Sequence, residues 1–109
     1  MKFLLDGCLL FLHIVRTANQ KEFPAVYLAA IEGLGTIGGP DAIDALLEVL
    51  YRGELFAPLR TRRTRGAAAH ALRRIGTADA LEGLRQASRR GSWGVRAAAK
   101  TELAQVRTS

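Results

Sequence analysis

Histidine and cysteine, which commonly act as bases, nucleophiles or metal ligands, are rare in this sequence: two histidines, His13 and His70, and one cysteine, Cys8. His70 lies in an alanine-rich stretch with no serine or cysteine beside it, so its setting favours an ordinary helical histidine over a catalytic base. A single cysteine excludes an internal disulfide, and these three residues lack the spacing of a zinc site. We therefore predict no catalytic residue, no metal site and no cofactor, in a protein that is not an enzyme.

Three glycines, Gly33, Gly35 and Gly38, have the spacing of the dinucleotide-binding motif G-x-G-x-x-G. That motif holds a pyrophosphate where it follows a β-strand and opens a helix of a parallel sheet. Here the preceding residues have helical spacing. We interpret the glycines as the end of one helix and the turn to the next, because glycine accepts positive φ.

Two pairs of carboxylates have types suited to general acid–base chemistry, Asp41 with Asp44 and Asp79 with Glu82. Each pair lies three residues apart in the first turn of a predicted helix. Negative side chains are stabilised there by the helix dipole. This position accounts for the carboxylates better than catalysis does.

Positive charge is concentrated in the second half of the chain. Residues 1–54 hold four basic and seven acidic residues, whereas residues 55–109 hold twelve basic and three acidic ones, within a net charge of +6. This asymmetry favours an acidic or polyanionic partner, with an ordinary solvated basic surface as the alternative. Cations at a helix start near residue 62 would oppose the helix dipole, so local stability does not account for Arg60, Arg62 and Arg63. We therefore predict that these three arginines bind the partner.

Three other residues of this half are predicted to serve the fold. Arg65 and Arg96 occupy matching positions in two predicted helices, where a guanidinium can bind the free carbonyls at the end of the preceding helix. Trp93, at the start of the last predicted helix, is interpreted as a packing or capping residue. One aromatic among many arginines is a weak signal for stacking on nucleic-acid bases.

The elements that would position these residues are helices. Alanine is abundant, whereas β-branched and aromatic residues are sparse. Residues 34–46 end one helix at glycine and open another at Pro40-Asp41, and the same pattern returns 38 positions later in residues 72–84. This recurrence indicates stacked helical hairpins. We predict six helices, near residues 2–17, 24–35, 40–52, 62–75, 77–90 and 92–106.

An Arg-x-Ala-Ala run leads to Leu-x-x-Ile-Gly, and Asp-Ala-Leu or Asp-Ala-Ile then opens an amphipathic second helix. This pattern resembles HEAT repeats, in particular the compact HEAT-like repeats of phycobilin lyases, over about residues 24–106. The resemblance implies an all-α fold, a short right-handed α-solenoid of antiparallel helix pairs. It also implies a non-catalytic scaffold for protein–protein interaction. The alternative is binding of nucleic-acid phosphates by the basic face, as in the HEAT-like folds of some DNA glycosylases.

In this arrangement residues 1–109 form one domain. Two repeats, 24–52 and 62–90, follow an unpaired second helix at 1–17 and precede an unpaired first helix at 92–106. The apolar arc of helix 1–17 is too wide for one neighbour to cover, so a missing upstream repeat, a second copy of the chain or another helix should cover part of it. The expected apolar strip comprises Phe3, Leu4, Leu10, Phe11 and Ile14.

The same N-terminal stretch raises the question of a targeting or membrane segment. Asp6 interrupts the apolar run, Lys2 is its only basic residue before that point, and no small-x-small cleavage site follows Val15. The run is also too short to span a bilayer. We therefore predict a cytoplasmic protein that does not contact a membrane.

Overall fold

The computed structural model describes residues 9–15, 24–52 and 58–108, apart from the side chains of residues 58–60 and 107–108. Five helices have defined bounds: α2 (Pro24–Ile37), α3 (Pro40–Tyr51), α4 (Pro58–Ile75), α5 (Ala78–Arg90) and α6 (Trp93–Thr108). Residues 9–15 are helical as well, and no strand occurs in the described ranges. The predicted all-α fold is confirmed.

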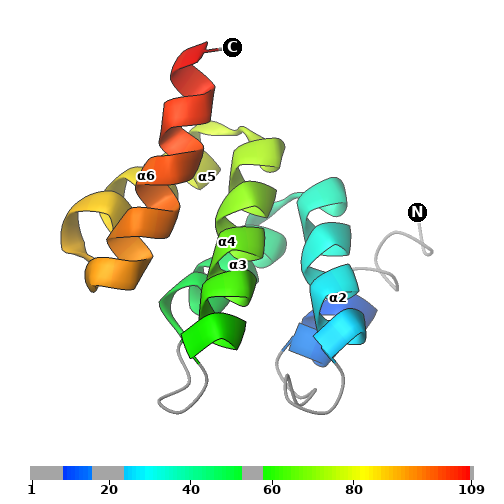
Figure 1. The fold of residues 1–109 in the computed structure, drawn as a ribbon. Helices are drawn as coiled ribbons and strands as arrows, with labels where there is room; N and C mark the ends of the chain where they lie inside the picture. The colour runs from blue at the N-terminus through cyan, green and yellow to red at the C-terminus, as the bar shows by residue number, and fades with distance from the viewer. Residues whose placement is uncertain (1–8, 16–23, 53–57, 109) are drawn as a thin grey trace.

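The helices form two layers. In Figure 1, α2, α4 and α6 run side by side in one direction, whereas α3 and α5 run in the opposite direction behind them. The central helix α4 packs on α2, α3, α5 and α6. The molecule measures 36 × 34 × 20 Å, and its short dimension matches two helices of about 10 Å each. This is a short α-solenoid of antiparallel helix pairs.

The first helix of each repeat ends in the same way. Gly38 and Gly76, which are 38 positions apart, have φ values of +70° and +69°. Their N–H groups donate to the carbonyls of Leu34 at 2.9 Å and Leu72 at 3.2 Å. This left-handed conformation stops a helix at little cost only for glycine. The recurring Ile-Gly pair of the sequence thus corresponds to a recurring turn.

The second helices begin with the predicted signals. Pro40 is the first residue of α3, where its missing N–H has no helical partner to lose, and Asp41 follows in the first turn. Thr77 caps α5, because its hydroxyl accepts a hydrogen bond from the N–H of Ala80 at 3.3 Å.

Buried side chains recur with the repeat. Ala30, Ala68 and Ala99 occupy equivalent positions in α2, α4 and α6, and each is at most 1% exposed. Such small residues let neighbouring helices approach closely. The same layer contact brings Gly35 of α2 against Ala71 of α4, where a β-carbon on the glycine would lie 2.9 Å from that of the alanine.

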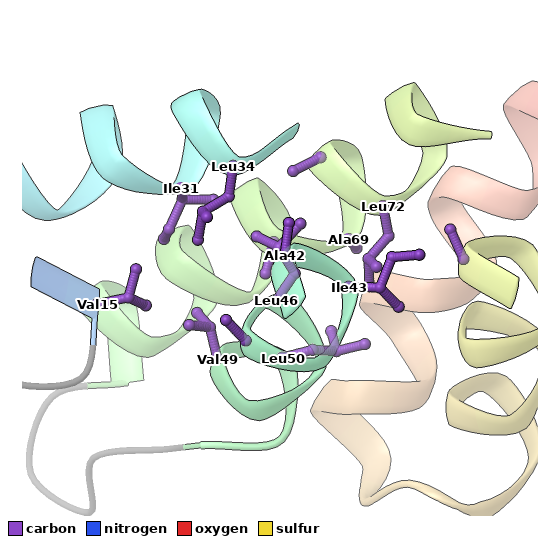
Figure 2. Close-up of a cluster of buried hydrophobic side chains, with 14 of the residues drawn as sticks. Val15, Ile31, Leu34, Ala42, Ile43, Leu46, Val49, Leu50, Ala69 and Leu72 are labelled. Atoms are coloured by element: carbon purple, nitrogen blue, oxygen red, sulfur yellow. The ribbon is translucent and has the colours of Figure 1, made fainter. Parts of the chain in front are cut away.

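Larger side chains fill the space between the layers. Figure 2 shows residues of α2, α3 and α4 converging on one cluster, and a valine of the 9–15 segment extends it. Burying one such aliphatic side chain stabilises the fold by roughly 1.5–3 kcal/mol. The labelled members are Val15, Ile31, Leu34, Ala42, Ile43, Leu46, Val49, Leu50, Ala69 and Leu72.

One predicted boundary is wrong in a way that affects the binding surface. The sequence pattern placed a loop up to residue 61, whereas α4 begins at Pro58. Proline is favoured at the first helical position, so it opens this helix and does not delay it. Residues 2–8 and 16–17 of the predicted N-terminal helix lie outside the described ranges.

Candidate binding surface

The three arginines that we predict to bind a partner lie in the first two turns of α4. Arg62 and Arg63 are exposed, and the side chain of Arg60 lies outside the described part of the structure. Because α4 begins at Pro58, Arg62 and Arg63 are its fifth and sixth residues. The dipole effect fades within the first turn, so our argument from dipole repulsion does not hold for these two residues.

Arg65 has the predicted structural role. Its Nε donates to the carbonyl oxygen of Leu50 at 3.1 Å, in the last turn of α3. Its Nη1 also lies so close to Gly94 of α6 that a β-carbon there would be only 2.7 Å away. One guanidinium therefore joins the end of α3, the N-terminal half of α4 and the start of α6.

Arg96 does not share that role, so this part of the prediction is wrong. Its side chain is exposed and makes no hydrogen bond or ion pair within the described ranges. The two arginines also lie at different distances from the start of their helices. Arg65 follows the first residue of α4 by seven positions, whereas Arg96 follows Trp93, the first residue of α6, by three.

Arg52 takes a structural role that the sequence did not reveal. It follows the last residue of α3, and its Nη1 donates to the carbonyl oxygen of Val15 at 3.1 Å and to the hydroxyl of Tyr27 at 3.2 Å. Tyr27 is fully buried. In both repeats, then, an arginine binds a carbonyl near the end of an earlier helix. The signal available in the sequence was an arginine directly after an apolar helix.

A polar cluster ties α4 to α6. Arg73 Nε donates to Glu102 Oε1 at 2.7 Å, and His70 Nδ1 lies 3.1 Å from the same oxygen. Nδ1 of His70 is also 3.2 Å from an Nη of Arg73, so it either accepts from Arg73 or carries a proton toward Glu102. His70 is half exposed, as expected of a surface helical histidine. Glu102, the single acid after residue 82, was the available signal for this contact.

Charge is divided between the layers. The helices α2, α4 and α6 contain nine basic and two acidic residues, whereas α3 and α5 contain three basic and five acidic ones. The halves of opposite charge in the sequence thus become, in part, faces of opposite charge. The excess of positive charge lies in the layer that contains α4 and α6.

Several exposed arginines lie together at one end of the stack. The starts of α4 and α6 lie at the same end as the terminal residues of α3 and α5 (Figure 1). Five exposed arginines at this end have no side-chain hydrogen bond or ion pair to any residue that the structure describes. We call this surface the basic end, and it comprises Arg62, Arg63, Arg89, Arg90 and Arg96.

The opposite end carries both signs of charge. Asp41 and Asp79 lie in the first turns of α3 and α5, and Asp44 and Glu82 are the fifth residues of these helices, all exposed. Arg73 and Arg74 lie at the same end, in the last turn of α4. The helix dipoles stabilise Asp41 and Asp79, as predicted from the sequence, whereas Asp44 and Glu82 lie beyond the first turn. Arg89 and Arg90 are explained likewise, as cations at the C-terminus of α5. Arg62 and Arg63 have no such local explanation.

Trp93 contradicts the packing role predicted for it. It is 80% exposed, the most exposed large apolar side chain of the described chain. As the first residue of α6, it lies at the basic end. The direction in which it points depends on where α6 docks, so no local pattern could have shown it.

The predicted apolar N-terminal strip is partly visible. Leu10 is 56% exposed. Its neighbour Leu9, which the prediction did not include, is 62% exposed. Phe11 and Ile14 are half-buried against the core, and the ring of Phe11 lies where a β-carbon on Gly33 would be. Phe3 and Leu4 lie outside the described residues. The role of this strip in binding stays a prediction.

Membrane spanning and metal binding are two other roles on which residues 9–15, 24–52 and 58–108 bear. None of the helices in these ranges has the length and apolar character to cross a membrane. Within the same ranges, no three histidine, cysteine or acidic side chains come together as metal ligands.

Comparison with known proteins identifies the repeats. The family model described as PBS lyase HEAT-like repeat matches residues 26–52 and again residues 64–90. These segments contain most of α2 with α3, and most of α4 with α5. Comparisons with curated proteins and with solved structures gave no match. Residues 26–52 and 64–90 are therefore two PBS lyase HEAT-like repeats, as the resemblance in the sequence implied.

Proposed function

We propose that this protein is a non-catalytic binding module that recognises an acidic protein surface through its basic end. The observation that supports this is the group of exposed arginines at the basic end. The side chains of Arg62, Arg63 and Arg96 have no hydrogen bond or ion pair to a described residue, whereas four of the five acids of α3 and α5 lie in the first two turns of these helices. HEAT-like repeats generally serve as protein-interaction scaffolds, which agrees with this role.

The chemistry of arginine suits such a partner. A guanidinium offers a planar set of donors that can bind a carboxylate through two parallel hydrogen bonds. Arg52 and Arg65 use their donors on carbonyls within the fold, and Arg73 binds Glu102. The arginines of the basic end make no side-chain hydrogen bond to a described residue, so their N–H donors can bind a partner. Their mutual repulsion is lowered when carboxylates bind.

Nucleic acid is the alternative partner, since phosphates are also bound by arginine. Binding to a nucleic acid without sequence preference usually combines a basic groove with several aromatic platforms. At the basic end the exposed aromatics of the described chain are Trp93 in one layer and Tyr51 in the other. This favours a protein partner.

The proposal is tested with two labelled probes, a twelve-residue glutamate peptide and a fifteen-residue oligothymidine. Fluorescence anisotropy at several salt concentrations gives the affinity of each. The double variant Arg62→Gln/Arg63→Gln should bind the glutamate peptide about fivefold more weakly and with a smaller salt dependence. The matched control is Arg74→Gln, which removes an exposed arginine from the far end of α4.

Four results would count against the proposal. The first is that wild-type protein binds neither probe at low salt, and the second is that the double variant keeps full affinity for the peptide. Tighter binding of oligothymidine, lost in the double variant, would establish the nucleic-acid alternative. A drop in Tm of the double variant without weaker binding would show that Arg62 and Arg63 are structural.

We further propose that the exposed leucines of residues 9–15 form a second contact surface, occupied by another copy of this chain or by upstream repeats. Leu9 and Leu10 are more than half exposed although they belong to the most apolar stretch of the sequence. Exposed leucines in series are a common mark of contact surfaces.

The absence of an internal disulfide, with one cysteine in the chain, agrees with a cytoplasmic location.

A further inference from the structure

Trp93 is the exposed side chain that the fold itself does not explain. It is the single tryptophan of the chain, and 80% of its surface faces solvent. Burial of so large an apolar side chain would normally stabilise the fold. Exposed tryptophans beside arginines are instead typical of protein interfaces, where these two residue types dominate the binding energy.

The neighbours of Trp93 on α6 are cations. Residues three and seven positions after it on a helix lie on the same face, and these are Arg96 and Lys100. Both are exposed and make no side-chain contact of the hydrogen-bond or ion-pair kind within the described ranges. Ala97 and Ala104 complete this face of α6, and both are exposed. This face of α6 therefore carries one large apolar group beside positive charges and small side chains.

Further cations lie just before Trp93 in the chain. Arg89 and Arg90 end α5, and only Gly91 and Ser92 separate them from α6. All of them therefore belong to the same end of the stack as Trp93 (Figure 1).

We propose that Trp93 is the apolar anchor of the basic end, and that its partner is an acidic protein segment with an apolar side chain between its carboxylates. The apolar side chain covers Trp93, while the carboxylates bind Arg96, Lys100 and the arginines that end α5. This inference rests on the proposed function and adds the requirement for an apolar residue in the ligand. The face of α6 favours a peptide over single-stranded nucleic acid, since alanines occupy the positions where further stacking platforms would lie.

The position of Trp93 also provides the assay. Because it is the single tryptophan, its fluorescence reports on this surface alone. Two twelve-residue peptides serve as probes: one of glutamates only, and one in which two central glutamates are replaced by leucines. We expect the leucine peptide to shift the emission to shorter wavelength and to bind about tenfold more tightly than the glutamate peptide, within the range of a hot-spot residue.

Labelled peptides extend the test to variants. In Trp93→Ala the preference for the leucine peptide should disappear, while the glutamate peptide binds as to wild type. Tyr51→Ala is the matched control, because Tyr51 is also an exposed aromatic at the end of a helix but belongs to the other layer. It should keep the preference. Circular dichroism should show unchanged Tm for Trp93→Ala, since its side chain is exposed.

The outcomes separate this inference from the function on which it rests. If both peptides bind equally and Trp93→Ala changes neither, the anchor is refuted and the proposed function stands. If neither peptide binds at low salt, the proposed function fails and the anchor fails with it. If oligothymidine quenches Trp93 while the leucine peptide does not, the surface binds nucleic acid and the inference is overturned.

Discussion

Replacing Arg65 with methionine tests the division between structural and binding arginines. Methionine keeps the unbranched apolar stem but removes the donor that binds the carbonyl of Leu50 at 3.1 Å. A hydrogen bond to a charged group contributes about 1.5–3 kcal/mol. Because this bond is only part-buried, water replaces some of it. We therefore expect the free energy of unfolding to fall by about 1–2 kcal/mol.

That loss is large enough to measure by thermal unfolding. The entropy of unfolding is about 2.1 cal/mol/K per residue near 60 °C, or roughly 0.23 kcal/mol/K for 109 residues. The Tm of Arg65→Met should therefore lie about 4–9 °C below that of wild type. The matched variant is Arg96→Met, at the equivalent repeat position but exposed, and its Tm should differ by less than about 2 °C.

The reasoning is refuted if Arg65→Met unfolds with the Tm of wild type. It is refuted equally if Arg96→Met is as destabilised as Arg65→Met, since the repeat position would then matter and the carbonyl contact would not. A binding assay with the glutamate peptide completes the comparison. Arg96→Met should bind more weakly, because Arg96 belongs to the basic end.

Three further predictions concern stability and assembly. Gly66→Ala should raise the free energy of unfolding by about 0.5–1 kcal/mol, since Gly66 has open space around it. Gly35→Ala should lower the free energy of unfolding by about 1–2 kcal/mol, because Ala71 lies too close. Urea unfolding of the two variants measures both changes. Glu102→Gln should lower the free energy of unfolding by about 1–2 kcal/mol in the same assay, because it weakens the contact of Glu102 with Arg73 that joins α6 to α4. A change near zero would show that this contact does not contribute to stability. If Leu9 and Leu10 bind a second copy of the chain, the sedimentation coefficient of wild type should rise with protein concentration, and Leu10→Asp should remain monomeric. A monomeric wild type would leave self-association without support.

Much of the fold could be predicted because its signals are local. The recurrence of Leu-x-x-Ile-Gly fixes where two helices end, since glycine alone accepts the left-handed turn at residues 38 and 76. The signals of Pro40 and Thr77 fix where the next helices begin. Each depends on a few neighbouring residues and on backbone sterics. The start of α4 was missed because Pro58 permits both a loop end and a helix start.

The candidate site depended on distances between residues far apart in sequence. Arg65 and Arg96 share one sequence pattern, yet one guanidinium binds the carbonyl of Leu50 and the other faces solvent. The contact of Arg52 with Val15 spans 37 positions, and that of Arg73 with Glu102 spans 29. Composition, together with the recurrence of residues 34–46 at 72–84, determined that the protein is a basic, helical repeat chain. Only the docking of the helices decided which arginines bind carbonyls within the fold, and that Trp93 remains exposed. The reason is that a carbonyl or an apolar surface must come within a few ångströms of a side chain to bind or bury it.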